Sequence, residues 1–181
     1  MVSDEQRESS KNSGMAPNDS TRLSVGWEHV LRERIGLYGH RNWIVIADSA
    51  YPALSRQGVE TIVADAAQID VLQRALNALS DSRHLKPVVY ADVELSFVDD
   101  DDAPGIEIYR QRLSRLLGGY ETKTLRHEEI ITKLDHASET FRVLIIKTNL
   151  TLPYTSVFLE LDCSYWKAES EAKLRARILH H

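Results

Sequence analysis

Short runs of apolar residues alternate along this chain with segments in which apolar residues recur every three or four positions. The runs are typical of buried strands, and the recurring spacing is typical of helices with one buried face. We predict strands over 43–47, 60–64, 87–95, 122–125, 142–147 and 156–161, and helices over 27–37, 69–79, 106–117, 127–134 and 166–179. Helices that alternate with strands predict an α/β fold, a single domain with a central sheet and helices on both faces.

The two ends of the chain depart from this pattern. The first 22 residues contain no aromatic residue and one valine, so they cannot bury enough apolar surface to offset the entropy of ordering. We predict a disordered leader over 1–22, a folded domain over 23–163 and an extension over 164–181. The extension is expected to form an amphipathic helix with Trp166, Leu174 and Ile178 on one face.

Composition narrows the class of protein. A length of 181 residues favours one domain, and a net charge of −5 argues against a general binder of nucleic acid or anionic membranes, which needs a basic face. The sequence has no apolar run near the ~18–20 residues that span a bilayer, and its start lacks the apolar region of a signal peptide. Cys163 is the single cysteine, which excludes an internal disulfide. We expect a cytoplasmic protein with no nucleic-acid or membrane partner.

The stretch LYGHRNWIVIADSAYP, residues 37–52, holds candidate chemistry at both ends of a predicted strand. His40 precedes the apolar run and Asp48 follows it, and an imidazole and a carboxylate can both exchange protons. Ligands of open α/β sheets bind at the carboxyl ends of strands, which favours a functional Asp48. Structural roles stay open: His40 can interact with the last carbonyls of a helix, and Asp48 can form a turn.

Further candidates lie in the second half of the chain. His127 begins a helix after a short strand, and Tyr154 follows a proline between two strong strands; each is either a structural residue or a ligand contact. The four aspartates 99–102 lack the spacing of a calcium loop and predict a solvated turn. The sequence contains no P-loop, dinucleotide-binding, serine-hydrolase or zinc motif.

The order and spacing of these pieces resemble the family of bacterial ribose pyranases and fucose mutarotases, the RbsD/FucU family. Its first motif is a Gly-His followed, eight residues after the histidine, by an aspartate at the end of an apolar strand. Gly39-His40 and Asp48 match this motif, and small residues and Pro52 follow as in the family. The resemblance extends over about residues 25–162.

Later segments match the family more loosely. Tyr109-Arg110 is similar to a pair on a helix of the fucose branch, and His127 corresponds to a ring-binding His or Arg. A Tyr-x-Asn motif of the family corresponds to Tyr154 and Ser156, with serine in place of asparagine. The serine is shorter and lacks an amide that can both donate and accept a hydrogen bond.

The resemblance implies an isomerase that interconverts sugar anomers, or pyranose and furanose rings, without a cofactor or a metal. His40 would be the proton donor, and Asp48 would hold a sugar hydroxyl or accept its proton. His127, Tyr154 and Ser156 would bind the substrate. Two alternatives stay open: a non-catalytic sugar-binding or regulatory protein on the same scaffold, and a purely structural oligomer.

Strand geometry sets a condition on this site. A five-residue strand rises ~3.3 Å per residue, so its two ends lie ~15–20 Å apart. His40 and Asp48 can therefore meet at one sugar only if residues 40–42 fold back or if two copies of the chain share a site. The resemblance implies ring-shaped homo-oligomers, often decamers, so we expect a site between subunits.

Overall fold

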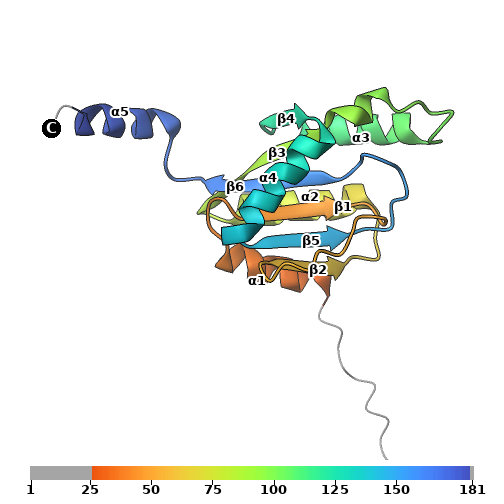
Figure 1. Cartoon of the computed structure of the whole chain (residues 1–181), viewed down its shortest axis with the longest axis horizontal. Coiled ribbons are helices and arrows are strands. Elements are labelled where there is room, and N and C mark those ends of the chain that lie inside the picture. Colours follow the sequence, from red (N-terminus) through yellow and green to blue (C-terminus); the bar gives the residue numbers. More distant parts are fainter. Residues whose placement is uncertain (1–25, 180–181) are drawn as a thin grey trace, which may run out of the picture.

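The computed structural model describes residues 26–179, so the leader predicted over 1–22 lies outside the described residues. Within this range, six strands form one sheet in the order β2-β5-β1-β6-β3-β4 (Figure 1). The strands are β1 (Trp43–Ala47), β2 (Val59–Val63), β3 (Leu85–Asp92), β4 (Thr122–Leu125), β5 (Val143–Lys147) and β6 (Val157–Cys163). Every strand predicted from an apolar run is present, with ends shifted by up to three residues.

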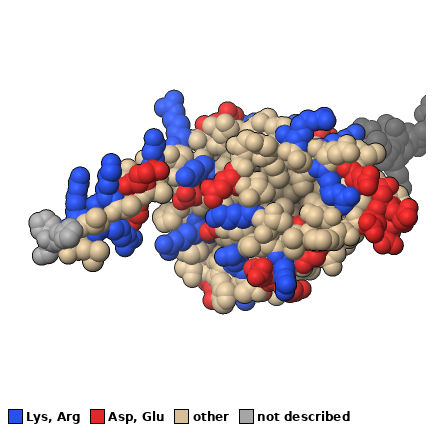
Figure 2. Space-filling view, turned by 90° about the horizontal axis from the view of Figure 1, so that it is seen from above, with Lys and Arg blue, Asp and Glu red and all other residues tan. Residues whose placement is uncertain are grey.

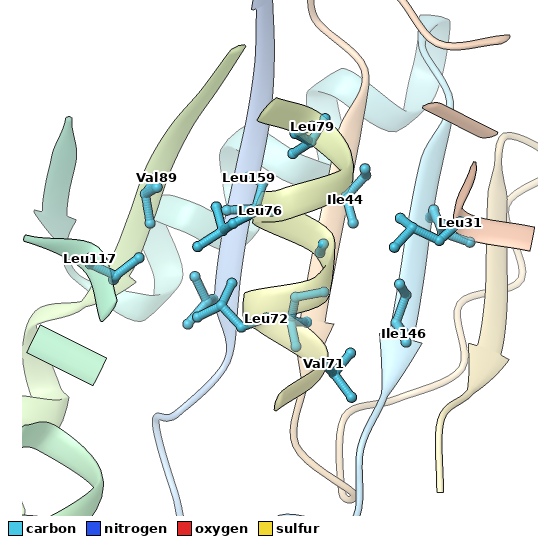
Figure 3. Close-up of a cluster of buried hydrophobic side chains, with 14 of the residues drawn as sticks. Leu31, Ile44, Val71, Leu72, Leu76, Leu79, Val89, Leu117, Ile146 and Leu159 are labelled. Atoms are coloured by element: carbon cyan, nitrogen blue, oxygen red, sulfur yellow. The ribbon is translucent and has the colours of Figure 1, made fainter. Parts of the chain in front are cut away.

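Helices cover both faces of this sheet, as predicted. On one face lie α1 (Trp27–Leu37), α2 (Gln68–Asp81) and α3 (Ile106–Leu117), and on the other lies α4 (His127–Thr140). Figure 3 shows Leu72 and Leu76 of α2 among the side chains that pack near Ile44 of β1 and Leu159 of β6. All five residues of β1 are buried because both of its faces are covered, which explains why its sequence is continuously apolar.

The directions of the strands determine which strand ends lie at the same edge of the sheet. β1 runs parallel to β5 and antiparallel to β6, and β5 runs parallel to β2. β3 is antiparallel to β6 and parallel to β4. β6 therefore runs against the other five strands, and its start lies beside their carboxyl ends. We call this side of the sheet, where β1 ends at Ala47, the carboxyl edge, and the opposite side, where β1 begins at Trp43, the amino edge.

The strand predicted over 87–95 ends earlier than expected. β3 stops at Asp92, and Val93–Phe97 form a short 3-10 helix, η1. The alternation of apolar residues continues past Asp92, and for this reason the predicted end of the strand lies three residues too late. The carbonyls of Leu95 and Val98 accept hydrogen bonds from Nη1 of Arg110 instead of from a neighbouring strand. This η1 turn brings Glu94 to the start of α4, as described below.

Three helices differ from their predicted lengths, α2 only by one residue at its start and two at its end. α4 continues to Thr140, six residues beyond the predicted end, because its second half is held by backbone bonds and buries Ser138. Apolar spacing fades after Leu134, so the pattern alone placed the end too early. In the extension, the helix α5 (Ala168–Ile178) begins two residues after Trp166, whose Nε1 donates to Glu171 Oε2 at 2.8 Å.

α5 stands apart from the rest of the molecule (Figure 1). None of its residues is buried, and Leu174 and Ile178 remain 42% and 61% exposed. Figure 2 shows Lys and Arg side chains along its length. No helix of residues 26–179 is long and apolar enough to cross a membrane.

The acidic run 99–102 forms an exposed turn before α3, as predicted. One of its carboxylates has a local structural role: Asp100 Oδ1 accepts hydrogen bonds from the backbone N–H groups of Gly105 and Glu107. A carboxylate at this position satisfies amide groups that have no partner within the helix. Gly105 has a φ of 95°, which only glycine adopts at low cost.

Candidate functional site

The carboxyl edge gathers polar side chains from four separate segments. Asp48 follows β1, Asp92 ends β3, His127 begins α4 directly after β4, and Ser156 precedes β6. Ser156 joins the group because β6 is antiparallel, so that its start lies beside the ends of β1 and β3. His127 lies beside Asp92 because β4 is parallel to β3. Two of the predicted substrate-binding residues, His127 and Ser156, are therefore at the same edge as the predicted catalytic Asp48.

Asp48 is held in place by the strand beside it. Ser156 Oγ donates to Asp48 Oδ2 at 2.9 Å and accepts from the Asp48 backbone N–H at 3.3 Å. The backbone N–H of Ala50 donates to Asp48 Oδ1 at 2.9 Å, so the turn role considered for this aspartate is present. Ser156 is buried, with 3% of its surface exposed. The carboxylate thus has one orientation, and its hydrogen bonds come from within the chain.

His127 is paired with a buried carboxylate. Its Nδ1 lies 3.0 Å from Asp92 Oδ2, and the Asp92 side chain is fully buried whereas that of His127 is 31% exposed. The backbone N–H of His127 donates to both carboxylate oxygens of Glu94, at 3.1 and 3.0 Å. These contacts explain why α4 begins at this residue, since Glu94 supplies an acceptor and a negative charge at the helix start.

Burial dominates the acid–base behaviour of Asp92. It raises the pKa of Asp92 from 3.8 to about 6. The hydrogen bond and charge of His127 oppose this rise, and the negative charges of Glu94 and Asp48 add to it. Asp92 Oδ1 has no hydrogen-bond partner among the described residues. The carboxyl edge therefore carries a buried acid that changes its charge near neutral pH.

Tyr154 completes this group on the solvent side. Its ring packs edge-on against the His127 ring, with centroids 5.8 Å apart, and 43% of the residue is exposed. Its φ of 55° is uncommon for a residue other than glycine and marks a conformation that the surroundings must hold. The ring is placed where it can contact a ligand that reaches His127.

Hydrogen bonds from α2 and α3 hold the loop that carries Tyr154. The carbonyl of Thr155 accepts hydrogen bonds from the Tyr109 hydroxyl at 2.8 Å and from Gln68 Nε2 at 3.0 Å. Gln68 Nε2 also donates to the carbonyl of Ile46 at 3.1 Å. Burial raises the pKa of the Tyr109 hydroxyl, and the charges of the nearby carboxylates add to this rise, so the hydroxyl stays a donor.

His40 does not join this group within one chain. It lies in an exposed turn at the amino edge, between α1 and β1. The residues after it do not fold back, because the Arg41 N–H donates to the Leu161 carbonyl and the Leu161 N–H donates to the Asn42 carbonyl. These bonds continue the pairing of β1 with β6 to the amino edge. The structure thus separates the two predicted catalytic residues by the full length of β1.

Solved structures with this architecture were found by comparison of the folds. RbsD of Bacillus subtilis, solved with D-ribose, is 20% identical, and the match covers 74% of this chain and 91% of that protein with a TM-score of 0.53. FucU of Bifidobacterium longum is 16% identical over 74% of this chain and 93% of that protein, with a TM-score of 0.50. The chain has the RbsD/FucU fold.

A third structure of the RbsD/FucU group is the fucose mutarotase of Streptococcus pneumoniae, solved with L-fucose. It is 20% identical over 76% of this chain and 93% of that protein, with a TM-score of 0.49. No protein-family model and no curated protein matches the sequence. RbsD and FucU match about equally, so the fold does not favour the fucose branch over the ribose branch.

Asp92 and Glu94 are the residues of this RbsD/FucU fold that the sequence analysis did not select. Both lay inside the segment predicted as a continuous strand. The rule that favoured Asp48, a carboxylate at the carboxyl end of a buried strand, applies equally to Asp92 once the strand ends there. No motif marks Glu94, because its contact is with a residue 33 positions away.

Two pockets approach the carboxyl edge of the RbsD/FucU fold from the side of α3. One of about 530 Å³ is lined by Asp92 and Arg110, together with hydroxyl groups of β4 and α3. Another of about 320 Å³ lies at Gln68 and Tyr109. No group of three or more His, Cys, Asp or Glu residues within 26–179 is placed to hold a metal ion.

Proposed function

We propose that this protein is a monosaccharide mutarotase or pyranase that interconverts the anomers, or the pyranose and furanose rings, of a fucose-like or ribose-like sugar. One observation carries the proposal: on the RbsD/FucU fold, Asp48, His127 and Tyr154 converge on one edge of the sheet, at the ends of strands. Carboxylates, imidazoles and aromatic faces are suited to hold a sugar by its hydroxyls and its apolar face.

The reaction needs only proton transfers. The anomeric hydroxyl loses a proton while the ring oxygen gains one, the bond between the anomeric carbon and the ring oxygen breaks, and a carbonyl forms. The reverse transfer closes the ring on the other face of the carbonyl or through another hydroxyl. Two groups that exchange protons near neutral pH are sufficient, so the proposed isomerase uses no cofactor.

In this proposal His40 donates the proton to the ring oxygen. Asp48, His127, Tyr154 and Ser156 bind the sugar, and Asp48 holds or deprotonates a hydroxyl. We propose that the unit responsible for this function is the domain over 23–163, with the extension over 164–181 outside it. We place the reaction in the cytoplasm.

The position of His40 makes the proposed site a shared one. Because His40 lies at the amino edge and Asp48 at the carboxyl edge, one sugar can reach both only if His40 comes from a neighbouring copy. Copies that join amino edge to carboxyl edge form a head-to-tail assembly, which closes into a ring when the rotation between copies allows it. We therefore propose a ring-shaped homo-oligomer, such as a decamer, with its sites between subunits.

Ser156 supports the alternative of a sugar-binding protein without catalysis. Its hydroxyl donates to Asp48 and accepts from the Asp48 backbone, so both of these capacities are used within the chain. The asparagine of the family would offer an amide with more donors and acceptors at this position. A site with fewer contacts to the sugar could bind it without accelerating ring opening.

Saturation-transfer NMR on the full-length protein tests the proposal. Fucose, ribose, galactose and rhamnose are screened for accelerated exchange between anomers. We expect acceleration for at least one sugar and its loss in His40→Ala, whereas His29→Ala, which changes an exposed histidine of α1, keeps the wild-type rate. A sugar that raises the melting temperature without exchange would support the binding protein, and the absence of both effects would leave the structural oligomer.

A further inference from the structure

The contact between His127 and Asp92 determines which ring nitrogen can act. An ionised carboxylate only accepts hydrogen bonds, so the 3.0 Å contact places the ring proton on Nδ1. A neutral imidazole with its proton on Nδ1 has its lone pair on Nε2. The carboxylate lies behind the ring in the protein interior, and the ring itself is partly exposed. His127 is therefore arranged to present an acceptor nitrogen toward the site.

The imidazole is also held in position from several sides. Glu94 of η1 accepts from its backbone, Asp92 of β3 contacts Nδ1, and the Tyr154 ring packs edge-on against it. A base positioned in this way loses little entropy when it meets a substrate. The Asp92 side chain is fully buried behind the imidazole, so we assign it a role through the ring.

Asp48 differs from His127 in this respect. Its Oδ1 already accepts from the Ala50 backbone, and its Oδ2 accepts from Ser156. Each oxygen keeps a further lone pair for a hydroxyl donor, so the carboxylate is well suited to orient a sugar hydroxyl. Ser156 and Ala50 donate hydrogen bonds to Asp48, whereas Asp92 accepts the His127 ring proton and so leaves the other ring nitrogen as a proton acceptor.

We propose that His127 Nε2 takes the proton of the anomeric hydroxyl, and that Asp92 is the positioning residue that keeps the His127 proton on Nδ1. The inference rests on the proposed function and assigns the proton acceptor within it. As the carbonyl forms, the proton passes to Nε2, and the ring oxygen takes a proton from His40 of the neighbouring copy. Ring closure returns both protons, so the enzyme is unchanged after one cycle.

The tautomer of His127 is measured without any sugar. The chain has seven histidines, so the ¹⁵N signals of the His127 ring are identified as those missing from the spectrum of His127→Gln. At pH 7.5 we expect a protonated Nδ1 and an unprotonated Nε2 in the wild type. In Asp92→Asn, whose amide can both donate and accept, we expect a mixture of the two tautomers. A wild-type spectrum with the proton on Nε2 overturns the proposal, whether or not any variant folds.

Kinetics test the proton transfer itself. On the sugar identified by the screen, His127→Gln should lower kcat roughly 100-fold or more, and Asp92→Asn roughly 10- to 100-fold, with smaller changes in KM. Asp135→Asn, which changes an exposed carboxylate in the middle of α4, away from both edges, is the matched control and should keep both constants. A higher KM with unchanged kcat in His127→Gln would make His127 a binding residue and refute the assignment.

The two parts of the test can fail separately. If the wild-type protein accelerates no sugar, the proposed function and the proton step fail together, and the spectrum still decides the role of Asp92 in setting the tautomer. If exchange is accelerated but Asp92→Asn keeps the wild-type kcat, the proposed function stands and the positioning role of Asp92 is rejected.

Discussion

The two edges of the sheet differ in how much of a site each one holds. At the carboxyl edge, Asp48, Asp92 and Ser156 are joined by hydrogen bonds to segments distant in the sequence. At the amino edge, His40 is exposed in a turn that Asn42 holds, with Asn42 Oδ1 accepting from the Gly39 N–H. One edge is preorganised by the fold, and the other presents His40 on an exposed turn. Such a difference is expected when the two edges of different copies complete each other.

The largest effect is expected when the defects at the two edges are placed in different chains of one oligomer. His40→Ala and Asp48→Asn are each expected to abolish anomer exchange, and co-expression should restore it. In a random equal mixture, one interface in four joins an intact carboxyl edge to an intact amino edge, so we expect about a quarter of the wild-type rate. The measurement is saturation-transfer NMR on purified mixed oligomers.

A control for this mixture is the double variant His40→Ala/Asp48→Asn co-expressed with His40→Ala. No chain in that mixture has His40, so no activity should return. A wild-type protein that is a monomer by light scattering and fully active would contradict the shared site.

Asp92 should make stability depend on pH. Because its pKa is about 6 in the folded protein and near 3.8 without burial, the folded state binds more protons between these values. The free energy of unfolding contributed by Asp92 should therefore fall as pH rises from about 4 to about 6. Asp92→Asn should remove this dependence and be more stable at pH 7, by up to about 3 kcal/mol. Urea unfolding at pH 4.5, 6 and 7.5 measures the difference.

The test of Asp92 also separates a structural role from a functional one. If Asp92 stabilises the fold, its replacement should lower the free energy of unfolding measured at pH 7. If Asp92→Asn is less stable than the wild type at pH 7 and keeps the pH dependence, the expected cost of burying this carboxylate is wrong.

Serines at the two ends of β6 allow the edges to be compared directly. Ser156→Ala removes a buried partner of the Asp48 carboxylate and should lower the free energy of unfolding by about 1–2 kcal/mol. Ser164→Ala removes a hydroxyl bonded to the Arg83 carbonyl on the exposed amino edge and should change it by less than about 0.5 kcal/mol. Urea unfolding of both variants measures the contrast, and equal losses would show that the edges are equally preorganised.

Removal of α5 should have the smallest effect. A chain that ends at residue 164 loses no buried side chain among the described residues 165–179. We expect the free energy of unfolding of the domain to change by less than about 0.5 kcal/mol. Thermal unfolding followed by circular dichroism measures this, and a clearly lower melting temperature would mean that α5 packs on the domain or on a second copy.

Local pattern was sufficient for most elements of the fold. The apolar run of β1 and the spacing of Leu72, Leu76 and Leu79 in α2 reflect burial that each segment undergoes by itself, so the sequence displays it. The end of β3 was missed because the chain turns there into η1, and the Leu95 carbonyl of η1 is bonded to Arg110, which lies on a different helix. A periodic pattern contains no information about such a contact.

The candidate site was predictable in part. The rise of a strand correctly separated His40 from Asp48, since it needs only the number of residues between them. The contact of Asp48 with Ser156 spans 108 positions, and that of His127 with Asp92 spans 35. The first depends on β6 being antiparallel to β1, and the second on β4 being parallel to β3, and both are properties of the whole sheet. The catalytic and binding roles of these residues stay predictions.

The carbonyl of Thr155 links the motions of three segments. It is bonded at once to Gln68, the first residue of α2, and to Tyr109, in the first turn of α3. The loop with Tyr154 therefore cannot move without either breaking these bonds or displacing the first turns of two helices. The rate of amide hydrogen exchange in those turns therefore reports the mobility of the loop. A molecule that rigidifies Tyr154 is expected to slow this exchange without contacting either helix.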